Sequence, residues 1–327
     1  MTDRVAVTGA TGFIGGHLVE RLIAEGRRVR ALARSFNRLP PGVRNCVDVV
    51  VGGLESRAAV GRTLHGADTV FHLAGLAAAW SPREDDYFAT NVAGVRRLLG
   101  AARREGVRRV VHVSTVLTLL PHLRHATPYA ASKLEGERRV QAYVASGGDA
   151  VIVHPCRVYG PGPLNDANGA TRLIRTFAFG HLAVLLRDGG ARGNYVHVDD
   201  VVDGLLLAAN RGETGGSYVL GGENCSLAEL FELVAELTGV RRPRLPVPRT
   251  AALTLAGVLE ACGRLGAPVP ITRAWVRSFF QDQAVDIAPT TAALGFHPRS
   301  LRVGLAETIA WLRQQKGGVP CEMPSAA

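Results

Sequence analysis

The sequence predicts an α/β fold in which a doubly wound parallel sheet is followed by a smaller mixed α/β lobe. Three observations carry this prediction. Short apolar runs alternate with amphipathic helical patterns up to about residue 158. The first apolar run ends in a glycine-rich turn that opens a helix. Beyond residue 158 the alternation stops, and prolines and glycines cluster between helical segments.

Six strands are expected in the first part of the chain, with a helix following most of them. The apolar strands cover residues 4–8, 28–33, 47–51, 69–75, 109–114 and 150–154. The amphipathic helices cover residues 15–25, 56–64, 86–105 and 128–146. Apolar strands separated by amphipathic helices form βαβ units, which build a parallel sheet with right-handed crossovers. In the second half, strands are expected at 195–198 and 217–220, and helices at 227–238, 250–265 and 301–313.

The composition limits the kinds of partner. The 327 residues are 47% hydrophobic, and the net charge is +10. The arginines are scattered without a basic tail or an aromatic-interleaved stripe, so no nucleic-acid partner is expected. No apolar run reaches membrane-spanning length and a strand follows Met1 closely, so we expect neither an integral membrane segment nor a signal peptide. Five scattered cysteines without a Cys-x-x-Cys pair indicate reduced thiols and a cytoplasmic location.

The turn after the first strand is a candidate nucleotide-binding site. Gly9, Gly12 and Gly15 stand at three-residue spacing between an apolar run and a helical pattern. Free N–H groups and the positive end of a helix can hold a diphosphate, and glycines remove side chains that would block its approach. We therefore predict a bound dinucleotide; a strand-to-helix turn that binds nothing is the alternative.

The end of the second strand indicates which dinucleotide binds. An acidic residue there would bond the ribose hydroxyls of NAD, but this chain has Ala33 followed by Arg34, with Arg38 close by. A guanidinium without a neighbouring carboxylate suits a 2′-phosphate. NADP(H) is therefore favoured, NAD(H) is left open, and a solvated surface role for Arg34 is the alternative.

Tyr129 and Lys133 form a Tyr-x-x-x-Lys pair, which puts both side chains on one helical face, one turn apart. Among 38 basic residues only Lys133 and Lys316 are lysines, which indicates that position 133 needs an ammonium. An ammonium near a phenol favours the phenolate and lowers its pKa towards neutrality. The tyrosine could then exchange a proton with a substrate oxygen while a nicotinamide exchanges a hydride with the attached carbon.

Taken together, the motifs resemble those of the extended short-chain dehydrogenase/reductase family, of the NAD-dependent epimerase/dehydratase type. In chain order they occupy residues 8–15, 72–75, 91–94, 114–115, 129–133, 158–162 and 197–200. The resemblance implies a Rossmann-type NAD(P)-binding domain over residues 1–158, to which strands at about 195–220 return. It also implies a substrate-binding lobe over 159–315; residues 316–327 are expected to form a flexible tail.

The resemblance also assigns roles to single residues. It implies Tyr129 as acid/base, Lys133 as its partner and ribose ligand, and Thr115 as the group that orients the substrate oxygen, with Ser114 as second choice. Asn91 would support the active site. The expected cofactor-binding residues are Gly9, Thr11, Gly12, Phe13, Ile14, Arg34, Leu54, Ala74, Gly75, Tyr129, Lys133 and Pro155.

Several positions depart from the family pattern. Gly53-Leu54 replaces the usual Asp-Leu near the adenine, and His154 precedes Pro155 where arginine is commoner. Arg192 lies one residue out of register with the arginine by which nucleotide-sugar members hold a diphosphate. Residues 77–80 and 250–265 suggest an apolar pocket or lid, with an ordinary buried helix as the alternative for 250–265. These features resemble the branch of 3β-hydroxysteroid dehydrogenases and dihydroflavonol reductases.

The function that these observations favour is an NADP(H)-dependent oxidoreductase. It would transfer a hydride between the nicotinamide and a ketone or secondary alcohol of an apolar small molecule. One alternative is a nucleotide-sugar epimerase or dehydratase with tightly bound NAD. A second is a non-catalytic NADP-sensing regulatory protein. The scattered histidines lack a third ligand at metal spacing, so no metal is expected, and a homodimer is left open.

Overall fold

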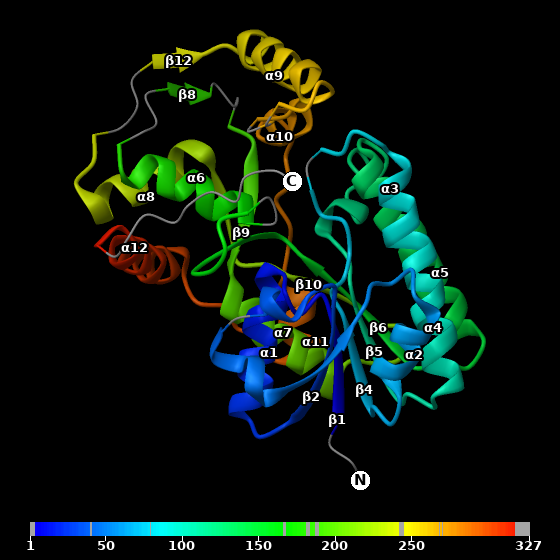
Figure 1. Cartoon of the computed structure of the whole chain (residues 1–327). Helices are drawn as coiled ribbons and strands as arrows, with labels where there is room; N and C mark the ends of the chain where they lie inside the picture. The colour runs from blue at the N-terminus through cyan, green and yellow to red at the C-terminus, as the bar shows by residue number, and fades with distance from the viewer. Residues whose placement is uncertain are drawn as a thin grey trace.

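The computed structural model describes residues 4–39, 41–78, 80–165, 168–180, 184–186, 190–241, 245–267, 269 and 271–317. A parallel sheet with helices on both faces carries a smaller lobe beyond the carboxyl ends of its strands (Figure 1). This arrangement confirms the predicted α/β, Rossmann-type fold class. It also defines where ligands would bind, since open α/β sheets bind them outside the carboxyl ends of the strands.

The large sheet has seven strands in the order β10-β6-β5-β4-β1-β2-β3, and every neighbouring pair is parallel. The chain runs outwards from β1 through β2 to β3, and then crosses to the other side of β1 to form β4. The order therefore reverses between β1 and β4, which makes this the switch point of the sheet. The strands are β1 (Arg4–Thr8), β2 (Arg28–Ala33), β3 (Val47–Val51), β4 (Thr69–His72), β5 (Arg109–Val113), β6 (Ala150–Pro155) and β10 (Ser217–Leu220).

Helices cover both faces of this sheet (Figure 1). One face carries α1 (Phe13–Ala24), α7 (Val198–Arg211) and α11 (Ala288–Leu294); the other carries α2 (Arg57–Leu64), α4 (Val95–Arg104) and α5 (Pro128–Ala145). Successive residues of a strand point to opposite faces, so Ala6 joins one apolar core and Val7 the other. Because both faces are buried, the central strands β1 and β6 are largely apolar, whereas β2 and β3 near the edge carry the charged Arg30 and Asp48.

The long helix expected over 86–105 contains a wider turn. It consists of α3 (Asp85–Phe88), a π-helical segment (Ala89–Gly94) and α4. Asn91 lies in the π-helical segment and is buried, where its amide donates to the Ser132 hydroxyl at 2.9 Å. Its Oδ1 accepts from the Leu76 backbone N–H at 2.9 Å. The wide turn therefore ties the loop after β4 to α5, and such turns often occur at functional sites.

The smaller lobe has its own core, in which Ile174, Phe177, Phe231 and Leu305 are almost fully buried. It is built from a three-stranded sheet in the order β11-β9-β7, three helices packed on it, and an outer part beyond them. The strands are β7 (Arg157–Tyr159), β9 (Arg192–His197) and β11 (Glu223–Ser226), and the helices are α6 (Gly169–Ala178), α8 (Leu227–Thr238) and α12 (Leu301–Gly317). The outer part holds β8 (Val184–Leu186), β12 (Leu245–Val247), α9 (Arg249–Gly263) and α10 (Arg273–Ser278).

Three short 3₁₀ turns lie in the loops of the large sheet. Two of them, Phe36–Arg38 and Pro41–Cys46, lie between β2 and β3, and the third, Val116–Thr118, follows β5.

One expectation about the second half is wrong. Of the strand expected at 195–198, residues 195–197 are part of β9, and Val198 begins α7. Strand β9 pairs with β7 and β11 and not with the large sheet. Only β10 returns to the large sheet, beside β6. The division into residues 1–158 and 159–315 stays a prediction. Of the expected tail, residues 318–327 lie outside the described residues, and α12 extends to Gly317.

A buried ion pair joins the two parts. Asp200 on α7 is 5% exposed, and its carboxylate accepts from Arg299 Nε at 2.9 Å and from the Arg299 backbone N–H at 3.1 Å. Arg299 lies just before α12 and also pairs with Glu307 on that helix. The Asp199-Asp200 segment therefore connects the sheet to the smaller lobe.

We expect the Asp200→Asn variant to lose about 2 kcal/mol of unfolding free energy, because it leaves a partly buried guanidinium with one charged partner fewer. Asp203→Asn is the matched control: Asp203 is on the same helix, is about half exposed and pairs with Arg21. Its loss should stay below about 1 kcal/mol. Urea unfolding of both variants measures this, and equal losses would contradict the role given to Asp200.

Candidate active site

A cleft of about 1460 Å³ lies between the carboxyl ends of the large sheet and the smaller lobe. The glycine turn and the end of β2 line one part of it, and Trp80, Trp275 and Phe279 line another. Every residue assigned above to catalysis or to cofactor binding lines this same cleft: Gly9, Thr11, Gly12, Phe13, Ile14, Arg34, Leu54, Ala74, Gly75, Ser114, Thr115, Tyr129, Lys133 and Pro155. The fold thus brings together residues from seven different segments of the chain.

The glycine turn has the geometry of a phosphate cradle. Gly9 has a φ of +78°, and a Cβ there would lie 2.6 Å from the backbone nitrogen of Ala74. A Cβ at Gly15 would overlap the carbonyl of Gly9. Helix α1 begins at Phe13 without a capping side chain and without an acidic residue in its first turn. Its first N–H groups therefore face the cleft uncapped, which fits the diphosphate of a dinucleotide.

A carboxylate lies at the β3 end of the cleft, although residue 53 is a glycine. A Cβ at Gly53 would overlap the carboxylate of Glu55, which also lines the cleft. The place that a side chain at position 53 would take is thus taken by an acidic group two residues further on. Glu55 was not predicted from the sequence to line the cleft; its only signal there is that it lies two residues after Gly53, where the family usually has an aspartate.

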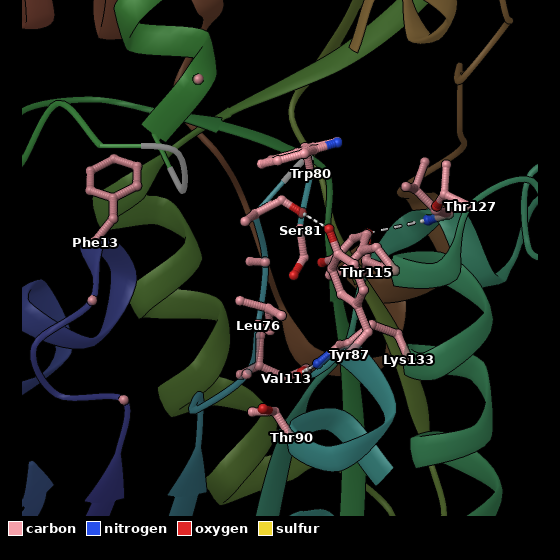
Figure 2. Close-up of a pocket in the computed structure, with 18 of the residues that line it drawn as sticks. Phe13, Leu76, Trp80, Ser81, Tyr87, Thr90, Val113, Thr115, Thr127 and Lys133 are labelled. Carbon is pink, nitrogen blue, oxygen red and sulfur yellow. Dashed lines mark hydrogen bonds between the residues drawn. The ribbon is translucent and has the colours of Figure 1, made fainter. Parts of the chain in front are cut away.

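The three groups predicted to be catalytic lie beside one another. The side chains of Thr115 and Tyr129 hydrogen-bond. Lys133, one turn after Tyr129 on α5, donates from Nζ to the Val113 carbonyl at 2.6 Å (Figure 2). Thr115 follows β5 directly. Tyr129 and Lys133 lie in the first two turns of α5, whose start is fixed by Thr127 as N-cap. Strand end and helix start therefore hold the two hydroxyls and the ammonium on rigid elements.

The protonation of this group differs from the expectation. Burial raises the pKa of Tyr129, and its hydrogen bond to Thr115 lowers it by less. Burial lowers the pKa of Lys133 to about 8, although Glu137 opposes this. The expected lowering of the tyrosine pKa by the ammonium is wrong for this structure, because Lys133 donates to the Val113 carbonyl and desolvation dominates at Tyr129. Tyr129 is thus a neutral phenol, which can donate a proton.

Ser114 is engaged away from the catalytic hydroxyls. Its hydroxyl donates to the buried Glu137, one turn after Lys133 on α5. His154 Nδ1 lies 3.6 Å from the same carboxylate, and His154 Nε2 is 2.8 Å from the Ser217 hydroxyl. The histidine that replaces the family's arginine therefore belongs to a buried polar network beneath the site. Because Ser114 serves this network, the geometry favours Thr115 for orienting a substrate.

Arg157 lines the cleft, although it was not predicted from the sequence to do so. Its guanidinium lies over the Phe279 ring, 4.7 Å from the centroid, and Nη2 donates to the Ser278 carbonyl at 2.7 Å. A Cβ at Gly193 would lie 2.8 Å from Arg157 Nε, so the glycine makes room for the arginine. Arg192 instead pairs with Glu229 and does not line the cleft. The glycine at position 193, which leaves space for a neighbouring side chain, was the feature of the sequence that could have indicated the position of Arg157.

Within the described residues, no group of three or more His, Cys, Asp or Glu side chains is arranged to hold a metal ion. The histidine His122, three residues before His125 in the sequence, has its Nε2 3.0 Å from the Asp282 carbonyl oxygen.

The lowered pKa of Lys133 predicts a pH-dependent stability. Between the folded pKa of about 8 and the unfolded value of about 10.4, the unfolded chain binds the proton and the folded chain does not. The unfolding free energy should therefore rise with pH across this window, and Lys133→Met should remove about 2 kcal/mol of that rise. Urea unfolding at about pH 8 and pH 10 measures it. Arg139→Met, on the exposed side of α5, is the control, and an unchanged slope in Lys133→Met would refute the assignment.

Comparison with known proteins places the chain in a family. The model of the NAD-dependent epimerase/dehydratase family matches residues 5–221. Sterol demethylase protein B of Methylococcus capsulatus is 30% identical over 326 residues, covering 94% of this chain and 98% of that protein. Ceramide reductase of Caulobacter vibrioides is 40% identical over 265 residues, covering 80% and 78%. The crystal structure of MoeE5 in complex with UDP-glucose and NAD superposes with a TM-score of 0.75 at 31% identity, covering 96% and 99%. The chain therefore belongs to the NAD-dependent epimerase/dehydratase family, within the extended short-chain dehydrogenases/reductases.

Proposed function

We propose that this enzyme is an NADP(H)-dependent reductase that transfers a hydride to a ketone of an apolar small molecule, and that it also catalyses the reverse oxidation. One observation carries the proposal: the Thr115–Tyr129–Lys133 group lines the same cleft as a set of large apolar side chains. These are Leu76, Trp80, Leu117, Leu123, Leu173, Trp275 and Phe279. A neutral phenol in a cleft with such side chains suits the protonation of a carbonyl oxygen.

The mechanism follows from the arrangement of these side chains. A bound nicotinamide supplies or accepts the hydride. Thr115 donates a hydrogen bond that orients the carbonyl oxygen, and the Tyr129 phenol donates its proton to that oxygen as the carbon is reduced. Lys133 is a buried cation held at the Val113 carbonyl, and its ammonium would bind the ribose hydroxyls of the dinucleotide. The uncapped start of α1 and the glycine turn would hold the diphosphate.

Two arginines support NADP(H) as the cofactor. Arg34 follows β2 directly and Arg38 lies one turn further, and both line the cleft. Neither forms an ion pair within the part of the chain that the structure describes, so both guanidinium groups are available to a 2′-phosphate. Ala33 leaves no carboxylate at the end of β2 to repel that phosphate.

The names of two relatives support an apolar substrate, since one is named for a sterol and the other for ceramide.

Arg157 favours the second candidate, a nucleotide-sugar epimerase or dehydratase. Its guanidinium has no carboxylate partner among the described residues, and could bind a diphosphate. The intact Tyr129–Lys133 pair argues against a non-catalytic sensor.

The decisive experiment follows the absorbance of reduced nicotinamide with NADPH or NADH against apolar ketones and nucleotide sugars. Consumption of NADPH with ketones supports the reductase, whereas sugar conversion without net consumption supports the epimerase and overturns the proposal. Tyr129→Phe should lower kcat by about 10²–10⁴-fold, because it removes the proton donor. NADPH binding, followed by fluorescence, should change less than about two-fold, since the phenol hydroxyl is not the main anchor of the dinucleotide. Full turnover in Tyr129→Phe would disprove its role.

Cofactor preference is tested separately. We expect Arg34→Ala to raise the Kd for NADPH by about 10–100-fold, as the loss of a charge-assisted hydrogen bond requires, and the Kd for NADH by less than about three-fold. Arg28→Ala is the control, because Arg28 is exposed at the other end of β2. Fluorescence titration of the wild type and of both variants with each dinucleotide gives the six dissociation constants. Equal weakening of both dinucleotides, or none, would exclude Arg34 as the 2′-phosphate ligand.

A further inference from the structure

His154 lies on β6 next to the catalytic group, and the mechanism given above leaves it without a role. The residue is 1% exposed. Its side chain points to the α5 side of the large sheet, as does that of Ile152 two residues earlier on the same strand. A polar ring is buried so completely only where its nitrogens find partners, so the partners indicate what His154 does.

One ring nitrogen contacts the backbone of Thr115. Nδ1 of His154 lies 3.2 Å from the Thr115 carbonyl oxygen. Because a carbonyl oxygen only accepts hydrogen bonds, Nδ1 carries a proton and donates it. Nδ1 is also 3.3 Å from the hydroxyl oxygen of Thr118, and that hydroxyl donates to the same carbonyl at 2.8 Å. The Thr115 peptide is therefore held both from β6 and from the turn that follows β5.

The other ring nitrogen fixes the orientation of the ring. Nε2 lies 2.8 Å from the Ser217 hydroxyl at the start of β10, the neighbouring edge strand. Burial lowers the pKa of His154, so the ring is neutral and Nε2 accepts from that hydroxyl. A flipped ring would lose both hydrogen bonds. Strands β6 and β10 together therefore fix where Nδ1 meets Thr115.

The backbone of Thr115 decides where its hydroxyl lies. A β-branched side chain has few χ1 rotamers, so its hydroxyl follows the peptide to which it is attached. The Thr115 side chain lines the cleft and hydrogen-bonds with that of Tyr129. A shift of about 1 Å in a group that orients a substrate can cost about 10²-fold in rate. The contact with His154 thus bears directly on the geometry of the catalytic group.

We propose that His154 is a positioning residue for the reduction: it holds the Thr115 carbonyl, and thereby keeps the Thr115 hydroxyl in place beside Tyr129. The effect on the reaction rests on the proposed function, whereas the effect on the position of Thr115 does not. His154 is absent from the described residues that line the cleft, so it would act only through Thr115.

Three variants of His154 test the proposal in the reduction of a ketone by NADPH. Asparagine keeps an N–H donor near the place of Nδ1, glutamine keeps one near the place of Nε2, and leucine keeps neither. We expect His154→Leu and His154→Gln to lower kcat about 10–100-fold, with much smaller changes in KM and in the Kd for NADPH. His154→Asn should keep kcat within about three-fold of the wild type, because its amide can donate to the Thr115 carbonyl.

His112→Leu is the matched control. His112 is also 1% exposed and lies on the neighbouring strand β5, on the same side of the sheet as Val110. Neither of its ring nitrogens has a hydrogen-bond partner among the described residues. Its kcat should stay within about two-fold of the wild type, whatever the change in thermal midpoint. The proposal is overturned if His112→Leu loses as much kcat as His154→Leu, or if His154→Asn does not recover it.

Crystal structures of the same four variants test the contact without any substrate. We expect the hydrogen bond between Thr115 and Tyr129 to persist in His154→Asn and His112→Leu, and to be broken in His154→Leu and His154→Gln. If the wild type reduces no ketone but these structures differ as expected, the proposed function fails and the positioning of Thr115 stands. If Thr115 stays in place in His154→Leu, the positioning role is refuted, whatever happens to kcat.

Discussion

The close approach of the glycine turn to the end of β4 is the constraint on which the site depends. Gly9 leaves no space for a side chain against the Ala74 backbone, and Gly15 leaves none against Gly9. This contact fixes the start of α1 at the point where the strand order reverses, so the helix end and the cleft meet there. A Cβ at either position would push the first turn of α1 out of the cleft. The phosphate cradle is thus a product of backbone packing and not of particular side chains.

Behind the catalytic group lies a buried polar network in which the charge of Glu137 partly offsets the effect of desolvation on the pKa of Lys133. Lys133 loses water and therefore part of its proton affinity, and Glu137 restores some of it. Glu137 is in turn satisfied by the Ser114 hydroxyl and lies close to His154. Such a network is stable only if its members are hydrogen-bonded, which explains why Ser114 faces inwards. The substitution of histidine for the family's arginine at 154 is accommodated by the Ser217 hydroxyl on β10.

The family hosts reductases, epimerases and dehydratases on one fold, so the fold by itself does not choose among them. In this chain the choice rests on the smaller lobe. Arg192 pairs with Glu229 away from the cleft, whereas Arg157 occupies the space left by Gly193 and lies against an aromatic ring inside it. Trp275 and Phe279, two of the large apolar side chains that line the cleft, are also in this lobe. Substrate choice would therefore vary without changing the nucleotide-binding sheet.

The sequence by itself determined the order of strands and helices up to residue 158, the glycine turn and the Tyr129–Lys133 pair, because these depend on local periodicity and short spacing. Only the tertiary structure decided that β9 leaves the large sheet, that Glu55 and Arg157 line the cleft, and that Ser114 serves Glu137. It also reversed the expected effect on the Tyr129 pKa. Each of these outcomes depends on contacts between residues far apart in the chain or on desolvation. Neither long-range contacts nor desolvation produce a periodic pattern that can be recognised in the sequence.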